Sequence, residues 1–225
     1  MIEFVKNLEI EFKKNANETN ANGQKAYMRH QFEFYGLKAA KRRELQKPFL
    51  TNEKLPEKSK LEPVIKALWT KPQRDFQYLG QELVFKYTKQ FEKKDIELLE
   101  YMITHKSWWD TVDYIAANPV GTYFKIYPKE INNRISQWLD SNNMWLQRSA
   151  LLFQLKYKEE LDTVLLENTI NYLLGSKEFF INKAIGWILR EYSKTNSNWV
   201  LEFTKRTDLD QLSKREALRL IIKAE

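Results

Sequence analysis

The sequence predicts an all-α fold of stacked helix pairs, and three observations favour this fold class. Apolar residues recur at helical spacing along nearly the whole chain, as at Ile185, Ile188 and Leu189. The 225 residues include only six glycines and six prolines, and no proline follows Pro128, so the tight turns of a multi-stranded sheet are scarce. Four aromatic-led segments also recur at nearly constant spacing, which indicates a helical repeat.

Candidate helices follow one another along the chain with short connections. They cover residues 2–14, 24–34, 38–47, 61–70, 73–89, 94–104, 107–117, 128–140, 143–156, 160–174, 178–194, 197–206 and 213–223. Glycine tolerates the left-handed conformation that ends many helices, and proline fits the first turn of a helix. Helices are therefore expected to stop at Gly36, Gly121 and Gly175 and to start at Pro63, Pro72 and Pro128.

One polar stretch, residues 47–63, interrupts the helical pattern. Its sequence is "KPFLTNEKLPEKSKLEP", with three prolines and no apolar periodicity. We expect this stretch to be a surface crossover rather than a domain boundary. The chain is accordingly predicted to form a single domain over residues 1–225.

The repeat becomes visible when four segments are aligned on an aromatic residue near the start of each. The segments are "RDFQYLGQELVFKY" (74–87), "SWWDTVDYIA" (107–116), "MWLQRSALLFQLKY" (144–157) and "FFINKAIGWILREY" (179–192). The aligned residues are Phe76, Trp109, Trp145 and Phe180, at steps of 33, 36 and 35 residues. Such a period in a helical chain is typical of TPR, HEAT or armadillo pairs, which bury their apolar faces against their neighbours.

In this alignment Asp113 occupies a position that is otherwise small: Gly80, Ser149 and Ala184 are its counterparts. An acid at such a position either points into a groove or is buried and paired. Trp109 lies four residues before Asp113, so both side chains share one face of the helix. Alternatively, Trp109 is an ordinary interface tryptophan between repeats.

Basic residues accompany an aromatic on the later repeats. Lys183, Trp187 and Arg190 follow one helix face at i, i+4 and i+7. Arg148 and Lys156 stand eight apart, two turns along one expected helix. Cations interleaved with an aromatic are typical of surfaces that meet phosphates and sugars.

Each of these residues also has a structural interpretation. Trp187 at helical spacing is compatible with a core position, and Arg148 with an ion pair to an acid such as Asp113. The basic run "KAAKRREL" (38–45) is compatible with either a solvated face or phosphate contacts.

Composition excludes several classes of function. Lys and Arg outnumber Asp and Glu by 37 to 30, and this net charge of +7 is compatible with a polyanionic partner. The absence of cysteine excludes disulfides and thiolate chemistry, and the two histidines, His30 and His105, do not form a metal-ligand motif. No metal or other cofactor is expected. No segment approaches the roughly 20 apolar residues that cross a bilayer, so no membrane partner and a soluble cytoplasmic protein are expected.

Five motifs together resemble the AlkD family of alkylpurine DNA glycosylases over essentially the whole chain. They are "YMRHQFEFYGL" (27–37), "KSWWDTVD" (106–113), "WLQRSALLFQLKYK" (145–158), "KEFFINKAIGWILREYSKTN" (177–196) and "LSKREALR" (212–219). The resemblance implies a right-handed α-α superhelix of HEAT-like pairs, a C-shaped solenoid whose basic concave groove holds duplex DNA. It also implies hydrolysis of the N-glycosidic bond of cationic N3- and N7-alkylated purines.

The resemblance implies roles for individual residues as well. Asp113 matches the family's catalytic acid, and Trp109 and Trp187 match the aromatics beside the sugar of the damaged nucleotide. The DNA-contacting groups expected are Tyr27, Arg43, Arg148, Lys156, Lys183 and Arg190. Ala39 and Ala40 depart from the Thr or Ser and Pro common in related proteins, which removes a hydroxyl contact or helix cap.

These residue types suit the implied reaction. A purine alkylated at N3 or N7 is cationic and leaves as a neutral base, so no acid is needed to protonate it. Positive charge moves onto the deoxyribose, where the Asp113 carboxylate would stabilise it and accept a proton from water, while indole faces attract the cation. The resemblance implies that no pocket receives the base, so bulky alkyl groups should be tolerated.

Two other interpretations stay open, both without catalysis. Helical repeats commonly bind proteins, so the same surface could hold an acidic partner, and an inactive relative could bind structured DNA. If duplex DNA is the partner, neutralising about four to six phosphates predicts a log-log salt slope of roughly −4 to −5. A monomer is expected.

Overall fold

The computed structural model describes residues 2–222, and this part of the chain contains helices but no strand apart from an isolated bridge between Glu33 and Gln73. The all-α prediction is confirmed. The chain divides into two compact units, Met1–Glu92 and Lys93–Glu225. No helix within residues 2–222 has the length and apolar character that crossing a membrane requires. The expected crossover at 47–63 lies inside the first unit.

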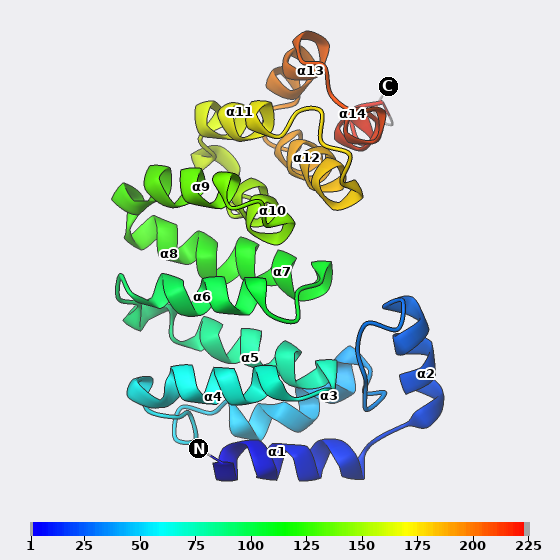
Figure 1. Ribbon diagram of the computed structural model, residues 1–225, viewed down its shortest axis with the longest axis vertical. Coiled ribbons are helices and arrows are strands. Elements are labelled where there is room, and N and C mark those ends of the chain that lie inside the picture. Colours follow the sequence, from blue (N-terminus) through cyan, green and yellow to red (C-terminus); the bar gives the residue numbers. More distant parts are fainter. Residues whose placement is uncertain (1, 223–225) are drawn as a thin grey trace. The chain divides into compact units, whose positions relative to one another are not determined.

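Five α-helices build the first unit (Figure 1). They are α1 (Ile2–Lys14), α2 (Glu18–Tyr27), α3 (Ala39–Gln46), α4 (Lys58–Thr70) and α5 (Arg74–Lys86). Helix α4 packs against α5, and α1 packs against α3 and α4. The rings of Phe12, Tyr35 and Phe76 are in mutual contact, with centroids 5.7 to 6.1 Å apart, and all three side chains are buried. Aromatic burial therefore ties α1 to α5 in this core.

The second unit contains the later helices of the described residues. They are α6 (Asp95–Thr104), α7 (Trp109–Ile115), α8 (Gly121–Ile126), α9 (Ile131–Asp140), α10 (Met144–Leu152), α11 (Thr163–Tyr172), α12 (Phe179–Tyr192), α13 (Ser197–Arg206) and α14 (Gln211–Leu218). Figure 1 shows them as successive layers, with α9 beside α10 and α13 beside α14. Helix α10 also packs against α6, α7 and α12, so it is the central element of the unit.

The second helix was expected at 24–34 but covers Glu18–Tyr27. The side chain of Asn17 caps its start by accepting a hydrogen bond from the Asn20 N–H at 2.8 Å. Arg29 and His30 have φ angles of 53° and 58°, a left-handed conformation that stops the helix. The prediction missed this start because the first residues of α2 are polar and show no apolar periodicity. The helix begins there because a single side chain, that of Asn17, caps its first turn.

Gly121 was expected to end a helix, and this prediction was wrong. A π-helical turn over Ala116–Val120 joins α7 to α8, so the helix continues past Gly121 to Ile126. Pro119 lies within that turn and cannot donate a backbone hydrogen bond, which explains the local widening. A Cβ on Gly121 would lie 2.7 Å from the Phe153 carbonyl oxygen, so glycine here permits close packing rather than helix termination.

Other helix limits also differ from prediction. Helix α14 was expected at 213–223 but covers Gln211–Leu218, and residue 223 lies outside the described residues. Helix α4 begins at Lys58, so Pro63 lies inside it rather than at its start. Helix α10 ends at Leu152, so Lys156 lies beyond it and not two turns along the same helix as Arg148.

The contact between α12 and α14 depends on Gly186. A Cβ at this position would lie 2.6 Å from the Glu216 Cβ and 2.8 Å from the Ser213 carbonyl oxygen. The Ser213 hydroxyl donates to the Asn182 carbonyl oxygen at 2.8 Å, which fixes the same contact. Helix α14 therefore lies directly on the backbone of α12.

Gly186→Ala is expected to lower the free energy of unfolding by about 1–3 kcal/mol, because the added methyl group overlaps backbone and Cβ atoms that cannot move independently. The matched control is Gly23→Ala in α2, where nothing lies within 4 Å of a Cβ. That control should stabilise the protein by about 0.5–1 kcal/mol. Chemical denaturation measures both. An unchanged stability of Gly186→Ala would contradict the packing described for α12 and α14.

Candidate active site

A pocket of about 340 Å³ lies in the second unit and unites most of the expected site residues. Its walls come from α7, α10 and α12. The lining residues are Trp109, Asp113, Arg148, Phe179, Phe180, Lys183, Trp187 and Arg190. We call it the carboxylate pocket, because Asp113 is the acid in its wall.

Helix α7 presents Trp109 and Asp113 to the carboxylate pocket from one face, as their spacing predicts. Trp108 precedes the helix in an extended conformation, with φ −159° and ψ 158°, so the helix begins at Trp109. The neighbouring face carries Val112 and Ile115, both fully buried. The apolar face thus anchors α7, and Asp113 is held at the pocket wall with 12% of its side chain exposed.

Arg148 on α10 holds the Asp113 carboxylate through both oxygens. Its Nε donates to Oδ1 at 2.7 Å, and its Nη2 donates to Oδ2 at 2.8 Å. Its Nη1 donates to the Phe180 carbonyl oxygen at the start of α12. Such a bidentate pair fixes the plane of the carboxylate and leaves each oxygen with acceptor capacity for one more donor. The ion-pair interpretation of Arg148 is therefore confirmed.

The protonation of Asp113 reflects two opposing effects. Burial raises the pKa of its carboxyl group above the ordinary value, and the hydrogen bonds and charge of Arg148 lower it. Burial is the larger effect, so the pKa is raised. Desolvation thus opposes the ionisation of Asp113, which the neighbouring cation favours. The bidentate geometry is nevertheless that of a carboxylate facing a guanidinium.

Trp109 and Trp187 both line the carboxylate pocket and are half-buried. A purely structural interpretation requires both indoles to lie wholly in the interior, and neither does. Trp187 follows Lys183 by one turn of α12, so an aromatic face and a cation lie next to each other on the same wall. The pocket therefore combines two indoles, one carboxylate and cationic groups.

Trp108, the residue before Trp109, has its ring against those of Trp145 and Phe180. The Trp108 ring lies 5.9 Å from that of Trp145 and 5.3 Å from that of Phe180, and the latter two are 5.1 Å apart. The first residues of the three helices align Trp109 with Met144 and Phe179, one residue before Trp145 and Phe180, so the sequence alignment is wrong by one residue. Trp108 fills the interface between repeats, which leaves Trp109 for the pocket.

The corrected register makes Asp113 the counterpart of two cations. Counted from the first residues of α7, α10 and α12, Asp113, Arg148 and Lys183 are each the fifth residue of their helix. Ser149 and Ala184 follow and are fully buried, as expected for small residues at close helix contacts. The equivalent position in α7, α10 and α12 thus supplies one acidic and two basic residues.

Lys183 and Arg190 both interact with Glu216 of α14. The Lys183 Nζ donates to Glu216 Oε1 at 2.7 Å, and the Arg190 Nη1 donates to Oε2. The hydrogen bond from Lys183 is the largest influence on Glu216 and lowers the pKa of its carboxyl group. Glu216 is buried, whereas the side chain of Lys183 is 38% exposed. The two cations, and not the acid, therefore line the pocket.

The remaining expected DNA contacts lie outside the carboxylate pocket. Lys156 is exposed in the turn after α10, and its Nζ donates to the Asn118 Oδ1 at 2.6 Å. Tyr27 ends α2 in the first unit and is 71% exposed. Their contacts with DNA stay predictions.

The basic run at 38–45 forms α3 in the first unit, and its residues differ in their environment. Helix α3 begins at Ala39 without a side-chain cap, as the departure at Ala39 and Ala40 implied. Arg42 is buried and pairs with Glu82 at 3.2 Å, whereas Arg43 is 63% exposed and lies 3.4 Å from the same carboxylate. Arg42 is therefore structural, and Arg43 keeps its predicted role as a DNA contact.

Sequence reasoning missed three residues of the site. Phe179 and Phe180 line the carboxylate pocket, and Glu216 pairs with its cations. Two adjacent aromatics at a helix start gave a signal for the phenylalanines. No sequence signal gave the role of Glu216, because it lies 33 residues after Lys183 and acts through the folding of α14 onto α12.

The fold and pocket define a helical-repeat protein with an ion-paired carboxylate and two indoles in one pocket. A family model described as DNA alkylation repair enzyme matches residues 8–221. A solved structure described as a predicted DNA alkylation repair enzyme from Enterococcus faecalis is 35% identical, with a TM-score of 0.86, and the match covers 92% of this chain and 97% of that one. Among curated proteins, none matches. The chain belongs to the AlkD-like family of DNA alkylation repair enzymes.

Proposed function

We propose that the protein is a DNA glycosylase that hydrolyses the N-glycosidic bond of cationic N3- and N7-alkylated purines in duplex DNA. The observation that carries this proposal is the position of Asp113. Its carboxylate lies in the wall of the carboxylate pocket, held through both oxygens by Arg148 and accompanied by Trp109 and Trp187. Membership of the alkylation repair family supports the choice of substrate.

The chemistry needs one carboxylate. The bond between C1′ and the alkylated purine breaks, and its electron pair goes to the purine, which leaves as a neutral base. Positive charge develops on the deoxyribose, and the Asp113 carboxylate stabilises it from the pocket wall. The oxygen of a water molecule bonds to C1′, and one of its protons passes to Asp113.

Arg148 and the two indoles prepare this step. Because Arg148 fixes the carboxylate before substrate arrives, little reorganisation is needed as charge develops. Indole faces attract cations by about 0.5 to 2 kcal/mol, depending on desolvation, so Trp109 and Trp187 favour a cationic sugar between them. Lys183 and Arg190 supply positive charge for the flanking phosphates.

The proposed enzyme uses both units of the chain. Tyr27 and Arg43 are its proposed DNA contacts in the first unit, and Lys156, Lys183 and Arg190 are those in the second. Arg148 was also expected to contact DNA, but its side chain is only 4% exposed and holds Asp113 instead. We propose that residues 1–225 act together as one glycosylase domain. The monomeric state, the cytoplasmic location and the basic concave groove stay predictions.

Incubation with a duplex that contains 7-methylguanine or 3-methyladenine tests the function. We expect free methylated base and an abasic site, detected by chromatography and by alkaline strand cleavage. Undamaged duplex is the control. If no base is released from either substrate, the proposal fails, and the interpretation as a non-catalytic module that binds structured DNA or an acidic protein takes its place.

Bulky alkyl groups are expected to be tolerated. The carboxylate pocket presents its acid and indoles for the sugar, and the cationic charge of the base, rather than its shape, makes the bond labile. We expect release of N7- or N3-adducts much larger than methyl with single-turnover rates within about tenfold of the methyl substrate. A complete block by large adducts, with methyl substrates still processed, would show that the base itself is enclosed.

A further inference from the structure

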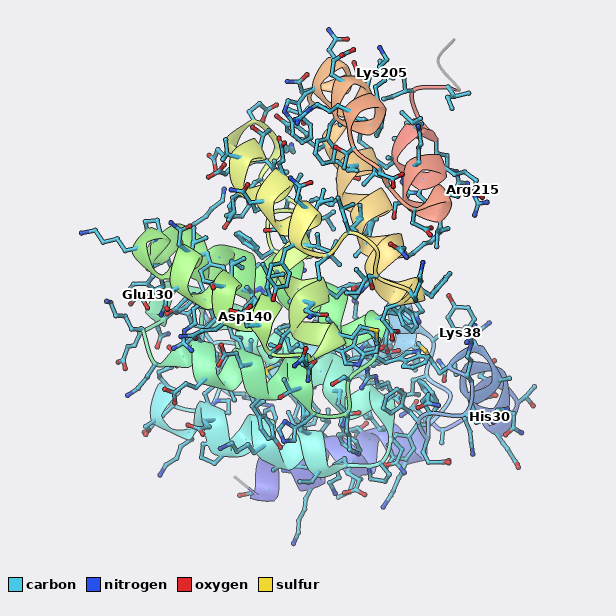
Figure 2. All side chains as sticks on the ribbon, turned by 45° about the horizontal axis from the view of Figure 1, so that its top comes forward. His30, Lys38, Glu130, Asp140, Lys205 and Arg215 are labelled. Carbon is cyan, nitrogen blue, oxygen red and sulfur yellow. The ribbon has the colours of Figure 1, made fainter. Side chains whose placement is uncertain are left out.

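Helix α14 brings an acid to the back of the carboxylate pocket. Glu216 lies against α12 because Gly186 leaves room for its Cβ, and the Ser213 hydroxyl bond to the Asn182 carbonyl holds the two helices together. Arg215, next to Glu216 in sequence, is exposed on α14 (Figure 2). Adjacent residues of α14 thus have opposite environments, and the buried one is the acid.

Glu216 joins two cations that stand two turns apart on the same helix. Lys183 and Arg190 lie on the same face of α12 with Trp187 between them, and all three line the carboxylate pocket. Each cation uses a separate oxygen of Glu216. Two flexible cationic side chains would otherwise repel each other and populate several rotamers.

We propose that Glu216 is a positioning residue, which holds Lys183 and Arg190 as a fixed pair for one backbone phosphate of the damaged strand. The inference rests on the proposed glycosylase function. The side chains of Lys183 and Arg190 are 38% and 22% exposed, so both can reach a ligand without leaving Glu216. Glu216, with 10% of its side chain exposed, does not itself meet the DNA.

This arrangement has two consequences of opposite sign. The negative charge of Glu216 cancels part of the positive potential at the pocket, so it weakens binding to any DNA. Its two bonds fix the cations, so it places the phosphate and with it the sugar next to Asp113. Glu216 therefore lowers affinity for DNA in general and raises the rate of cleavage.

The Glu216→Gln variant separates these consequences. We expect a single-turnover rate of 7-methylguanine release about tenfold below wild type at saturating enzyme, because the cations are no longer fixed. Binding to an undamaged duplex should tighten, and its log-log salt slope should become steeper by up to about 0.9, the contribution of one further neutralised phosphate. Fluorescence anisotropy at several salt concentrations measures the binding.

A second variant changes one of the two cations and leaves Glu216 in place. Lys183→Met removes one cation and its bond to Glu216, while the packing of α14 on Gly186 and the Ser213 bond to Asn182 stay in place. Its cleavage rate should fall as in Glu216→Gln, but its binding to undamaged duplex should weaken, with a shallower slope by up to about 0.9. If Glu216→Gln does not fold, Lys183→Met alone must show the fall in rate while it remains folded.

The matched control breaks an ion pair away from the pocket. Glu167 accepts hydrogen bonds from Arg206 Nη1 and Nη2, both at 2.6 Å, between α11 and α13. Glu167→Gln should leave both rate and salt slope at wild-type values. A purely structural Glu216 would change thermal stability but neither quantity, and weaker binding by Glu216→Gln would also overturn the proposal.

Failure of the proposed function is distinguishable from failure of this inference. If the wild-type protein releases no base, the glycosylase proposal fails. In that case binding to undamaged duplex alone tests the role of Glu216. This role requires the salt slope to become steeper in Glu216→Gln and shallower in Lys183→Met. Equal or absent shifts overturn the role of Glu216.

Discussion

Asp113→Asn is expected to lower the single-turnover rate of base release by about 10²–10³-fold while the protein stays folded and bound to DNA. The amide keeps the shape of the side chain but cannot stabilise a cationic sugar or accept a proton. Arg148 loses its counter-charge, so affinity for DNA should not fall. Base release from 7-methylguanine duplex and anisotropy with the same duplex measure the two quantities.

The matched control for this change is Asp110→Asn. Asp110 lies on the same helix and does not line the carboxylate pocket, and its replacement by Asn removes the same negative charge. Its negative charge raises the pKa of Asp113, so its removal should leave the rate near wild type at neutral pH. An active Asp113→Asn enzyme would remove the chemical basis of the proposed function.

Arg148→Met is expected to lower the free energy of unfolding by about 3–5 kcal/mol at pH 7.5, because it leaves the Asp113 carboxylate buried without its partner. The side chains of the pair are only 4% and 12% exposed, so solvent screens the loss little. Cleavage at neutral pH should also fall, since Asp113 then holds its proton more tightly. Urea denaturation measures the stability.

The stability loss in Arg148→Met should depend on pH. Without Arg148, the folded-state pKa of Asp113 lies further above its unfolded value. Such a group destabilises the folded state when it is ionised, so the loss is complete above the folded pKa and shrinks as pH falls toward the unfolded pKa. The variant should therefore approach wild-type stability in mild acid. A loss independent of pH would mean that packing, not the unpaired carboxylate, is responsible.

The helices with strong apolar periodicity were predictable from the sequence. Helix α12 was expected at 178–194 and covers Phe179–Tyr192, because its buried residues recur every three to four positions. For Asp113 the sequence left two alternatives, facing a groove or buried and paired, since a carboxylate is costly to bury without a partner. Arg148 was among its expected partners, and the ion pair is present.

Other features depend on contacts that the sequence does not reveal. Trp108 and Trp109 are identical as letters, and only the start of α7 decides which one enters the interface. The continuation past Gly121 depends on how closely α8 approaches Phe153, which is tertiary information. Glu216 acquires its role only when α14 folds onto Gly186, so local pattern could not reveal it.

The central claim is that the ionised carboxylate of Asp113 drives cleavage, and the pH dependence of the single-turnover rate tests it most directly. Burial raises the pKa of Asp113 above the ordinary value of 3.8, so the carboxylate is lost as pH falls through that raised value. After subtraction of spontaneous depurination, the rate should rise with pH along one ionisation above 3.8 and then reach a plateau. A rate that stays flat, or that rises as pH falls, would contradict the account.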